Sequence, residues 1–236
     1  MDKLQLIISE RPMFHKGETE INRPILNSES LLSSKTIKKL EDDALTCYGI
    51  GADVLNFIAD NIRAGNKTLE TGAGCSTLVF AYCGANHTAV TPSISEINLI
   101  TNYATLNDIK IDKVKFVQES SDSFLPRNNE TNYDLILIDG KHAFPWPVLD
   151  WFYTADKLKE GGLMIIDDTR MKPVSILTEF LKSDTAWIEV ANLSNNTSVF
   201  RKVKPTIHDV AWHMQPYSFT SPVGRIGRKI RQLLKL

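Results

Sequence analysis

The sequence predicts an α/β domain in which a mostly parallel sheet is covered by helices on both faces. From Lys67 onward, short apolar segments alternate with segments of helical periodicity, and this alternation is typical of a parallel sheet. Residues 133–139 and 163–167 are almost continuously apolar, as expected for strands that are buried on both faces. Two late strand segments are separated by the turn residues 194–196, which predicts one antiparallel strand at the edge of the sheet.

Hydrophobic periodicity places the individual elements. Strands are predicted over 67–71, 87–90, 113–118, 133–139, 163–167, 187–193 and 198–203, and helices over 76–85, 95–107, 147–159 and 174–183. The helix over 147–159 is expected to end at Gly161 and Gly162. Residues 1–34 are predicted to be extended or loop-like, and residues 36–62 to form two helical segments. The chain therefore divides into a helical N-terminal extension (1–66), a sheet domain (67–203) and a basic tail (204–236).

The composition excludes an intrinsically disordered chain and argues against a nucleic-acid partner. Of the 236 residues, 42% are hydrophobic and 23% are charged, which is close to the average of globular proteins. Lys and Arg number 27 against 28 Asp and Glu, so the formal net charge is −1. The basic excess that is usual in nucleic-acid-binding proteins is missing, and we expect no nucleic acid as a partner.

Cysteine content and hydropathy favour a cytoplasmic location. The cysteines Cys47, Cys75 and Cys83 are odd in number and include no CxxC pair, which argues against a disulfide framework and a structural zinc site. The N-terminal segment is interrupted by charges, and no stretch approaches the ~20 apolar residues of a membrane-spanning helix. We therefore expect a cytoplasmic protein with reduced thiols.

A glycine-rich turn, ETGAGCST at residues 70–77, follows the first predicted strand and opens a helix. Gly72 and Gly74 allow the backbone to approach a ligand closely, and Ser76 or Thr77 can cap the helix while its amide groups receive a polar ligand group. The Glu70 carboxylate at the strand end favours a cationic or amine-bearing ligand over a pyrophosphate. Thr77 stands where the dinucleotide pattern GxGxxG needs its third glycine, which argues against NAD. The alternative is a tight turn that binds no ligand.

Three motifs, in order along the chain, resemble those of class I S-adenosylmethionine-dependent methyltransferases over roughly residues 67–203. Glu70-x-Gly72-x-Gly74 resembles their first motif, in which the glycines face the cofactor and the acidic residue helps to hold its methionine amine. Residues 137–142 (LIDGKH) resemble the IDG-x-H stretch of small-molecule O-methyltransferases related to catechol and macrolide-sugar methyltransferases. Residues 159–163 and 166–169 resemble the LK-x-GG turn and the acidic strand end that follows it. The resemblance implies a Rossmann-like, doubly wound sheet of seven strands and S-adenosylmethionine as cofactor.

The resemblance also points to residues that contact the nucleoside. In the family, the second strand usually ends in an acidic residue that binds the ribose hydroxyls, whereas here Thr91-Pro92-Ser93 follows and the nearest carboxylate is Glu96. Thr91, Ser93 and Glu96 are therefore all candidates for the ribose contact. Ser121 and Asp122 lie in a segment that resembles the adenine contact, and the alternative for this segment is a polar loop with a helix cap.

Asp139 and Asp168 end two adjacent predicted strands, where their carboxylates can share one hard cation. The resemblance implies a divalent metal at Asp139, Asp168 and the next residue, which is Thr169 here and a carboxamide in the metal-dependent relatives. Mg²⁺ would suit such an all-oxygen site. The alternative is that Asp139 orients cofactor or substrate and that Asp167 or Asp168 is a solvated strand end.

His142 is the predicted general base, because its position matches a basic residue that deprotonates the acceptor hydroxyl in the relatives. A hydroxyl is a poor nucleophile until its proton leaves, and an imidazole with a reference pKa near 6.5 suits this role. Lys141 is the second candidate, and a structural loop histidine is the alternative. Of the aromatic residues that follow, Trp151 and Phe152 are predicted to lie in the core, and Trp146 is left open between core and acceptor pocket.

The basic tail predicts an amphipathic helix. Its sequence GRIGRKIRQLLKL places apolar side chains at helical spacing among five basic residues. Weak contact with an anionic membrane surface, docking on the protein's own core and docking on a second subunit in a homo-oligomer are the three alternatives.

These observations predict a methyltransferase that uses S-adenosylmethionine and acts on a hydroxyl of a small molecule, such as a sugar or a secondary metabolite. One alternative is another nucleoside-dependent transferase on the same fold, for example an aminopropyl transferase. The other is a nucleoside-binding module that has lost the chemistry.

Overall fold

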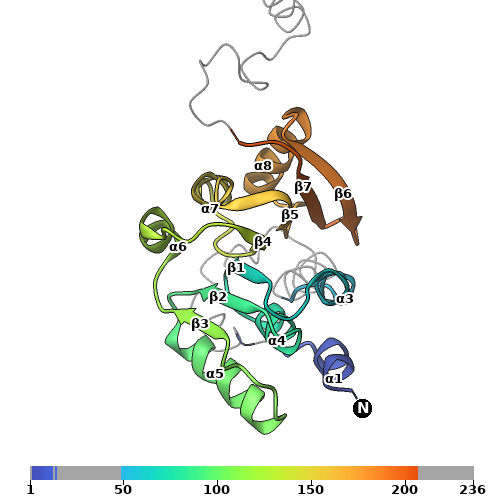
Figure 1. Ribbon diagram of the computed structural model, residues 1–236, viewed down its shortest axis with the longest axis vertical. Helices are drawn as coiled ribbons and strands as arrows, with labels where there is room; N and C mark the ends of the chain where they lie inside the picture. The colour runs from blue at the N-terminus through green and yellow to red at the C-terminus, as the bar shows by residue number, and fades with distance from the viewer. Residues whose placement is uncertain (1, 13, 15–48, 207–236) are drawn as a thin grey trace, which may run out of the picture.

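The computed structural model describes residues 2–12, 14 and 49–206 (Figure 1). The first helical segment predicted within 36–62 and the amphipathic helix of the tail lie outside these residues. In the described part of the chain, no helix combines the length and the apolar character needed to cross a membrane.

A seven-stranded sheet organises the molecule. Its strands are β1 (Lys67–Thr71), β2 (Asn86–Val90), β3 (Val114–Val117), β4 (Tyr133–Ile138), β5 (Leu158–Ile166), β6 (Trp187–Leu193) and β7 (Thr197–Lys202), in the spatial order β3-β2-β1-β4-β5-β7-β6. The first five strands are parallel, and β7 pairs antiparallel with both β5 and β6. The doubly wound, mostly parallel class is confirmed. The reversed strand β7 is second from the edge, and its hairpin partner β6 is outermost.

Helices cover both faces of the sheet (Figure 1). They are α1 (Lys3–Glu10), α3 (Ala52–Asn61), α4 (Cys75–Tyr82), α5 (Ile94–Leu106), α6 (Ser121–Phe124), α7 (Trp146–Thr154) and α8 (Lys172–Ser183), with a 3₁₀ helix η1 (Leu125–Arg127). Side chains of β4 alternate between the two layers, because Leu135 and Leu137 join the core under α1, α3, α4 and α5, and Ile136 and Ile138 join the core under α7 and α8. The continuously apolar strands are thus buried on both faces, as predicted.

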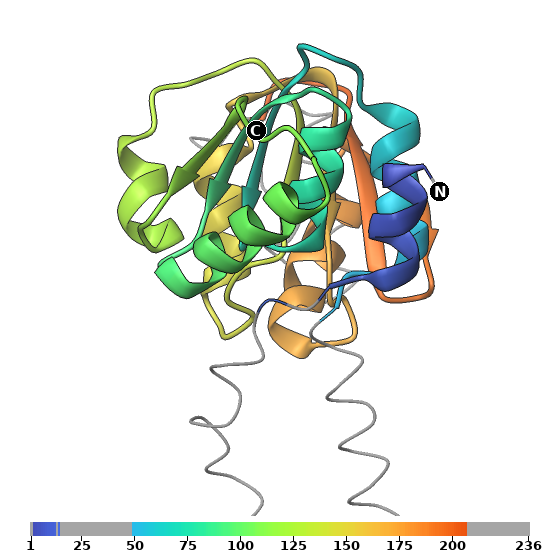
Figure 2. The ribbon, with the colours of Figure 1, turned by 90° about the horizontal axis from the view of Figure 1, so that it is seen from below.

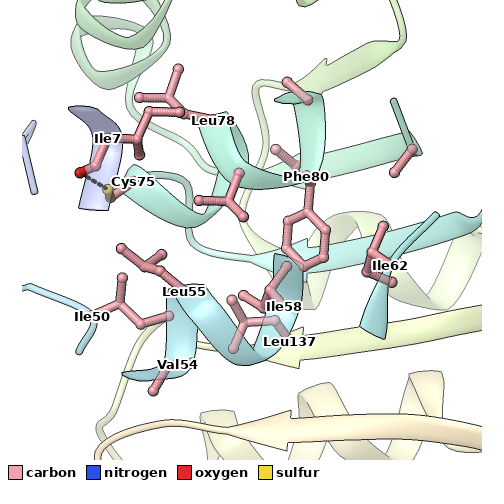
Figure 3. Close-up of a cluster of buried hydrophobic side chains, with 14 of the residues drawn as sticks. Ile7, Ile50, Val54, Leu55, Ile58, Ile62, Cys75, Leu78, Phe80 and Leu137 are labelled. Carbon is pink, nitrogen blue, oxygen red and sulfur yellow. Dashed lines mark hydrogen bonds between the residues drawn. The ribbon is translucent and has the colours of Figure 1, made fainter. Parts of the chain in front are cut away.

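The prediction of extended or loop structure for residues 1–34 was wrong at its start, where the structure has α1. Leu4, Ile7 and Ile8 have the i, i+3, i+4 spacing of a helical apolar stripe within a charged segment. Ile7 is fully buried, and Figure 2 shows α1 beside α3 and α4. The Cys75 thiol at the start of α4 lies 3.7 Å from the Ile7 carbonyl oxygen (Figure 3). Packing against α4 thus stabilises a helix whose charges obscured its periodicity.

The predicted end of the helix over 147–159 was also wrong. α7 ends at Thr154, and Gly161 and Gly162 lie inside β5 instead of stopping a helix. Strand pairing begins early, with Tyr133 opposite Leu158, and the register shifts before Leu135 pairs with Leu163. Gly161 has φ +81°, a conformation that glycine adopts without strain, so the glycines allow this irregularity in the strand.

Candidate active site

The two glycines of the turn after β1 have different surroundings. Gly72 has φ +85°, and a Cβ atom there would collide with the backbone carbonyl of Asp139 at the end of β4. Gly72 is therefore required for the close approach of two neighbouring strand ends. A Cβ atom on Gly74 would meet nothing within 4 Å, and Gly74 lines a pocket. Gly74 is thus the glycine of this pair that borders space for a ligand.

The Glu70 carboxylate is buried and already has partners within the protein. Its side chain is 1% exposed, Ser76 Oγ donates a hydrogen bond of 2.6 Å to Oε2, and the Thr77 hydroxyl donates to Oε1. His87 Nε2 lies 3.1 Å from Oε1. Thr77 Oγ1 also accepts a hydrogen bond from the Gly74 amide at 2.9 Å. Glu70 therefore shapes the glycine-rich turn and the start of α4, through a contact with His87 that the sequence did not reveal.

The pocket lies between the turn and the N-terminal extension. The turn and Asp139 at the end of β4 contribute to its lining, together with residues that precede and follow the segment 15–48 in sequence. The lining residues are Arg11, Pro12, Phe14, Gly49, Ile50, Ala73, Gly74, Cys75, Ser76 and Asp139. Of the predicted cofactor residues, Gly74, Ser76 and Asp139 thus share one pocket.

The three ribose candidates meet at the carboxyl end of β2. Thr91 Oγ1 donates a hydrogen bond of 2.7 Å to Glu96 Oε2, and both side chains are buried. Ser93 caps α5, because its hydroxyl accepts a hydrogen bond from the Glu96 amide at 3.2 Å. The geometry thus joins Thr91, Ser93 and Glu96 into one polar group at the end of the strand beside β1.

Ser121 and Asp122, the adenine candidates, begin α6 after β3. Ser121 is buried and Asp122 is exposed. A hydrogen bond from Ser120 lowers the pKa of Asp122, with a smaller contribution from the charge of Lys141. The pair therefore presents one buried hydroxyl and one exposed carboxylate next to the end of β3.

Asp139, His142 and Asp168 converge at the ends of β4 and β5. His142 Nε2 lies 3.5 Å from Asp139 Oδ1 and 3.4 Å from Asp168 Oδ2. One ligand atom from each of the three residues lies within 4.8 Å of the others. Adjacent parallel strands end at the same edge of the sheet, which is why residues distant in sequence meet here.

The cluster perturbs the pKa values of its members. Burial raises the pKa of Asp139, and the charge of Asp168 adds to this effect while His142 opposes it. Burial alone would lower the pKa of His142, but Asp139 and then Asp168 outweigh it and raise that pKa. An imidazole between two carboxylates can accept a proton and remain stabilised in its charged form.

Thr169, the third predicted metal ligand, contacts the turn between β6 and β7 through its backbone. Its backbone amide donates a hydrogen bond of 2.7 Å to the Asn196 carbonyl oxygen, and Asn196 Nδ2 donates one of 2.9 Å to Asp168 Oδ1. The turn between β6 and β7 thus orients Asp168, a contact that the turn composition of residues 194–196 did not suggest. The third metal-ligating side chain that the geometry offers beside the two aspartates is His142.

Comparison with protein families adds an independent observation. Residues 69–169 match the family model described as a methyltransferase domain. Over these residues the chain is similar to a methyltransferase domain. No curated protein matches the chain in sequence. The matched segment runs from β1 through the Asp168 end of β5, so it contains the turn and the Asp139–His142–Asp168 cluster.

Solved structures of methyltransferases share the fold of this chain. A provisionally assigned caffeoyl-CoA O-methyltransferase from Staphylococcus aureus is 17% identical, with a TM-score of 0.56 over 74% of this chain and 94% of that protein. A methyltransferase from Geobacter sulfurreducens is 11% identical, with a TM-score of 0.55 over 75% and 93%. A provisionally assigned rRNA methylase from Clostridium thermocellum is 14% identical, with a TM-score of 0.54 over 65% and 96%. At these identities the likeness concerns the fold.

One buried carboxylate near the site was not predicted from the sequence. Asp150 on α7 is 1% exposed, and burial raises its pKa to about 6, although the hydroxyl groups of Ser121 and Thr71 partly offset this effect. Its one signal in the sequence is an acidic residue inside the apolar stretch PVLDWF. Asp150 therefore lies near the end of β1, at Thr71, and near the start of α6, at Ser121, which is a predicted adenine contact.

The aromatic residues after His142 divide between core and surface. Trp151 is buried and packs edge-to-face against Phe180, as predicted for the core. Phe152 is 45% exposed, so its assignment to the core was wrong, because it lies on the outer face of α7. Lys141 Nζ lies 3.6 Å from the ring centroid of Trp146, a cation–π contact beside the cluster.

Proposed function

We propose that this protein methylates a hydroxyl group of a small molecule, such as a sugar or a secondary metabolite, with His142 as general base. The observation that carries the proposal is the position of His142 Nε2, 3.5 Å from Asp139 and 3.4 Å from Asp168. Asp139 also lines the pocket beside the glycine-rich turn. A proton acceptor therefore stands next to the space in which a methyl donor would bind.

The cofactor would lie across the carboxyl ends of β1, β2 and β4, at the point where the strand order reverses. Gly74, Ser76 and Asp139 would bound its amino-acid end. Thr91, Ser93 and Glu96 would face the ribose, and Ser121 and Asp122 the adenine. Glu70 would act indirectly, since Ser76 and Thr77 occupy its oxygens.

The protein groups would prepare the acceptor for an in-line displacement. S-adenosylmethionine supplies an electrophilic methyl group on a sulfonium. Neutral His142 would take the proton of the acceptor hydroxyl as its oxygen bonds to the methyl carbon, while the bond from that carbon to sulfur breaks and S-adenosylhomocysteine leaves. Asp139 and Asp168 would stabilise the resulting imidazolium, since opposite charges at this distance favour the charged form. The raised pKa of His142 is in the direction expected for a base flanked by two carboxylates.

His142→Ala tests the base. We expect turnover to fall about 10²- to 10⁴-fold, the usual contribution of general-base catalysis, while affinity for S-adenosylhomocysteine is kept. The assay would use a radiolabelled methyl donor with a panel of catechols and sugar nucleotides, and calorimetry would measure binding. Lys141→Ala is the matched control from the adjacent position. Normal turnover in His142→Ala with loss in Lys141→Ala would assign the base to Lys141 instead.

A divalent cation such as Mg²⁺ is a second candidate for the cluster. Asp139 and Asp168 supply the oxygen ligands that suit Mg²⁺, and the imidazole of His142, with an atom within 4.8 Å of theirs, is a ligand that suits transition metals better. Asp139, Asp168 and His142 would hold it, Thr169 being the oxygen ligand that the family resemblance implies. A bound cation would lower the pKa of the acceptor hydroxyl. Turnover that survives EDTA supports the base alone, and turnover that EDTA abolishes and Mg²⁺ restores supports the cation.

The acceptor class rests on the chain's own chemistry. The net charge of −1 does not favour a nucleic-acid acceptor, although one protein of similar fold carries the name of an rRNA methylase. An aminopropyl transferase would need further acidic residues around its amine, and a non-catalytic module would bind S-adenosylhomocysteine without turnover on any acceptor. Cytoplasmic location, weak membrane contact by the tail and homo-oligomerisation stay predictions.

A further inference from the structure

Building on the proposed function, we infer that the N-terminal extension completes the cofactor site and that Arg11 binds the carboxylate at the amino-acid end of the cofactor. Arg11 precedes the segment 69–169 that matches the methyltransferase family by more than fifty positions. Arg11 therefore lies outside the segment that matches the family model, and it lines the pocket together with residues of that segment.

The charges of the pocket suit a zwitterion. Among the described residues that line the pocket, Arg11 is the one basic side chain and Asp139 is the one carboxylate. Cys75 stays a neutral thiol, because burial raises its pKa to about 12 against the opposing charge of nearby Arg11. A free α-amino acid group carries one ammonium and one carboxylate, which these two side chains can pair with separately. A simple anion such as phosphate would gain Arg11 but would be repelled by Asp139.

The amino end of α4 adds donors for the same carboxylate. α4 begins at Cys75 with Gly74 as its N-cap, and the pocket is lined by both residues and by Ser76. The first amide groups of a helix lack partners within the helix and carry partial positive charge. A carboxylate held by these amides and by an arginine gains charge-assisted hydrogen bonds from both sides. The ammonium group would then point to Asp139.

The position of Arg11 depends on packing that the structure describes. Arg11 directly follows α1, and its amide donates a hydrogen bond of 2.9 Å to the Ile7 carbonyl oxygen. Ile7 is fully buried against α4, the same helix whose amino end borders the pocket. α1 thus brings Arg11 to the pocket by packing against α4, the helix whose first residues also line the pocket.

Two ligands separate this role from general cofactor binding. S-adenosylhomocysteine carries the amino-acid group, and 5′-methylthioadenosine keeps the adenosine and the sulfur but lacks that group. We expect Arg11→Ala to weaken S-adenosylhomocysteine binding about 10- to 100-fold in calorimetry, the range for losing a hydrogen bond to a charged group. Affinity for 5′-methylthioadenosine should change less than about twofold. Arg11→Lys should recover part of the loss, because it keeps the charge but not the bidentate geometry.

Arg63→Ala is the matched control, because this arginine is exposed and its guanidinium donates hydrogen bonds to the carbonyls of Ala59 and Ile62, in and just after α3. It should leave both affinities unchanged. Unaltered S-adenosylhomocysteine affinity in Arg11→Ala would overturn the inference, and so would an equal loss for both ligands with an unchanged thermal unfolding curve. Wild-type protein that binds neither ligand would overturn the proposed function itself, which distinguishes the two failures.

Discussion

Glu70 and Gly72 show how motif residues can shape the turn that borders a pocket. The sequence motif implies that Glu70 holds a cofactor amine and that both glycines face the cofactor. In the structure, Ser76 and Thr77 occupy the Glu70 carboxylate, and a side chain on Gly72 would strike the Asp139 carbonyl. Both residues therefore set the shape of the turn, and Gly74 and Ser76 are left to border the pocket.

Asp150 gives a prediction about pH and stability. Burial raises its pKa to about 6, above the value of about 3.9 in an unfolded chain, so the folded state binds the proton more tightly. The free energy of unfolding should therefore fall as pH rises from about 4 to about 6. Above that range the ionised carboxylate costs the fold roughly 3 kcal/mol, because each pKa unit corresponds to about 1.4 kcal/mol.

Asp150→Asn keeps the shape of the side chain and removes its charge. We expect it to raise the free energy of unfolding at pH 7 by about 1–2 kcal/mol and to flatten the stability profile between pH 4 and 6. Urea unfolding at several pH values measures both effects. Exposed Asp112→Asn should stay within about 0.5 kcal/mol of the wild type. The same pH slope in Asp150→Asn and the wild type would show that Asp150 ionises normally.

At the scale of elements, the sheet was predictable and its additions were not. β4 and the end of β5 follow from apolar runs, and β1 follows from its place before the glycine-rich turn. The meeting of Asp139 with Asp168 follows from adjacent strand ends. α1 was missed because its stripe is short and lies among charges. Its contact with α4 joins residues that lie far apart in the sequence, and no local sequence pattern predicts such a contact. The same holds for Arg11 in the pocket and for His87 beside Glu70.

Ile7→Ala tests the packing of α1. Ile7 is fully buried in the cluster of Figure 3, so truncation should cost about 2–4 kcal/mol through lost burial and a residual cavity. Ile94→Ala is the same change in α5 at a side chain that is 50% exposed, and it should cost less than about 0.5 kcal/mol. Denaturant unfolding measures both. Equal, small effects would mean that α1 contributes little to the fold.

At the scale of the whole molecule, the candidate site residues gather at the carboxyl ends of the parallel strands. The ends of β1, β2, β3, β4 and β5 carry the turn, the ribose and adenine candidates and the Asp139–His142–Asp168 cluster, and α1 adds Arg11 from outside the sheet. The opposite ends of these strands and most of the β6–β7 hairpin lie away from these carboxyl ends. This segregation follows from strand polarity, because parallel strands place their carboxyl ends together.

Hydrogen exchange can test this arrangement over the whole chain. A ligand that binds the folded state at about 100 times its Kd stabilises it by about 2.7 kcal/mol, and the amides that it covers exchange more slowly. With saturating S-adenosylhomocysteine we expect slower exchange in peptides spanning 2–12, 70–77, 91–96, 119–122 and 139–142. Peptides from β6, which lies at the far edge of the sheet, should exchange at the rate of the free protein. In Arg11→Ala the ligand should no longer slow exchange in the peptide 2–12, but it should still slow exchange in 91–96, because the ribose contacts remain. Slower exchange confined to β6 and β7 would place the ligand at the far lateral edge of the sheet and would contradict the proposed cofactor site.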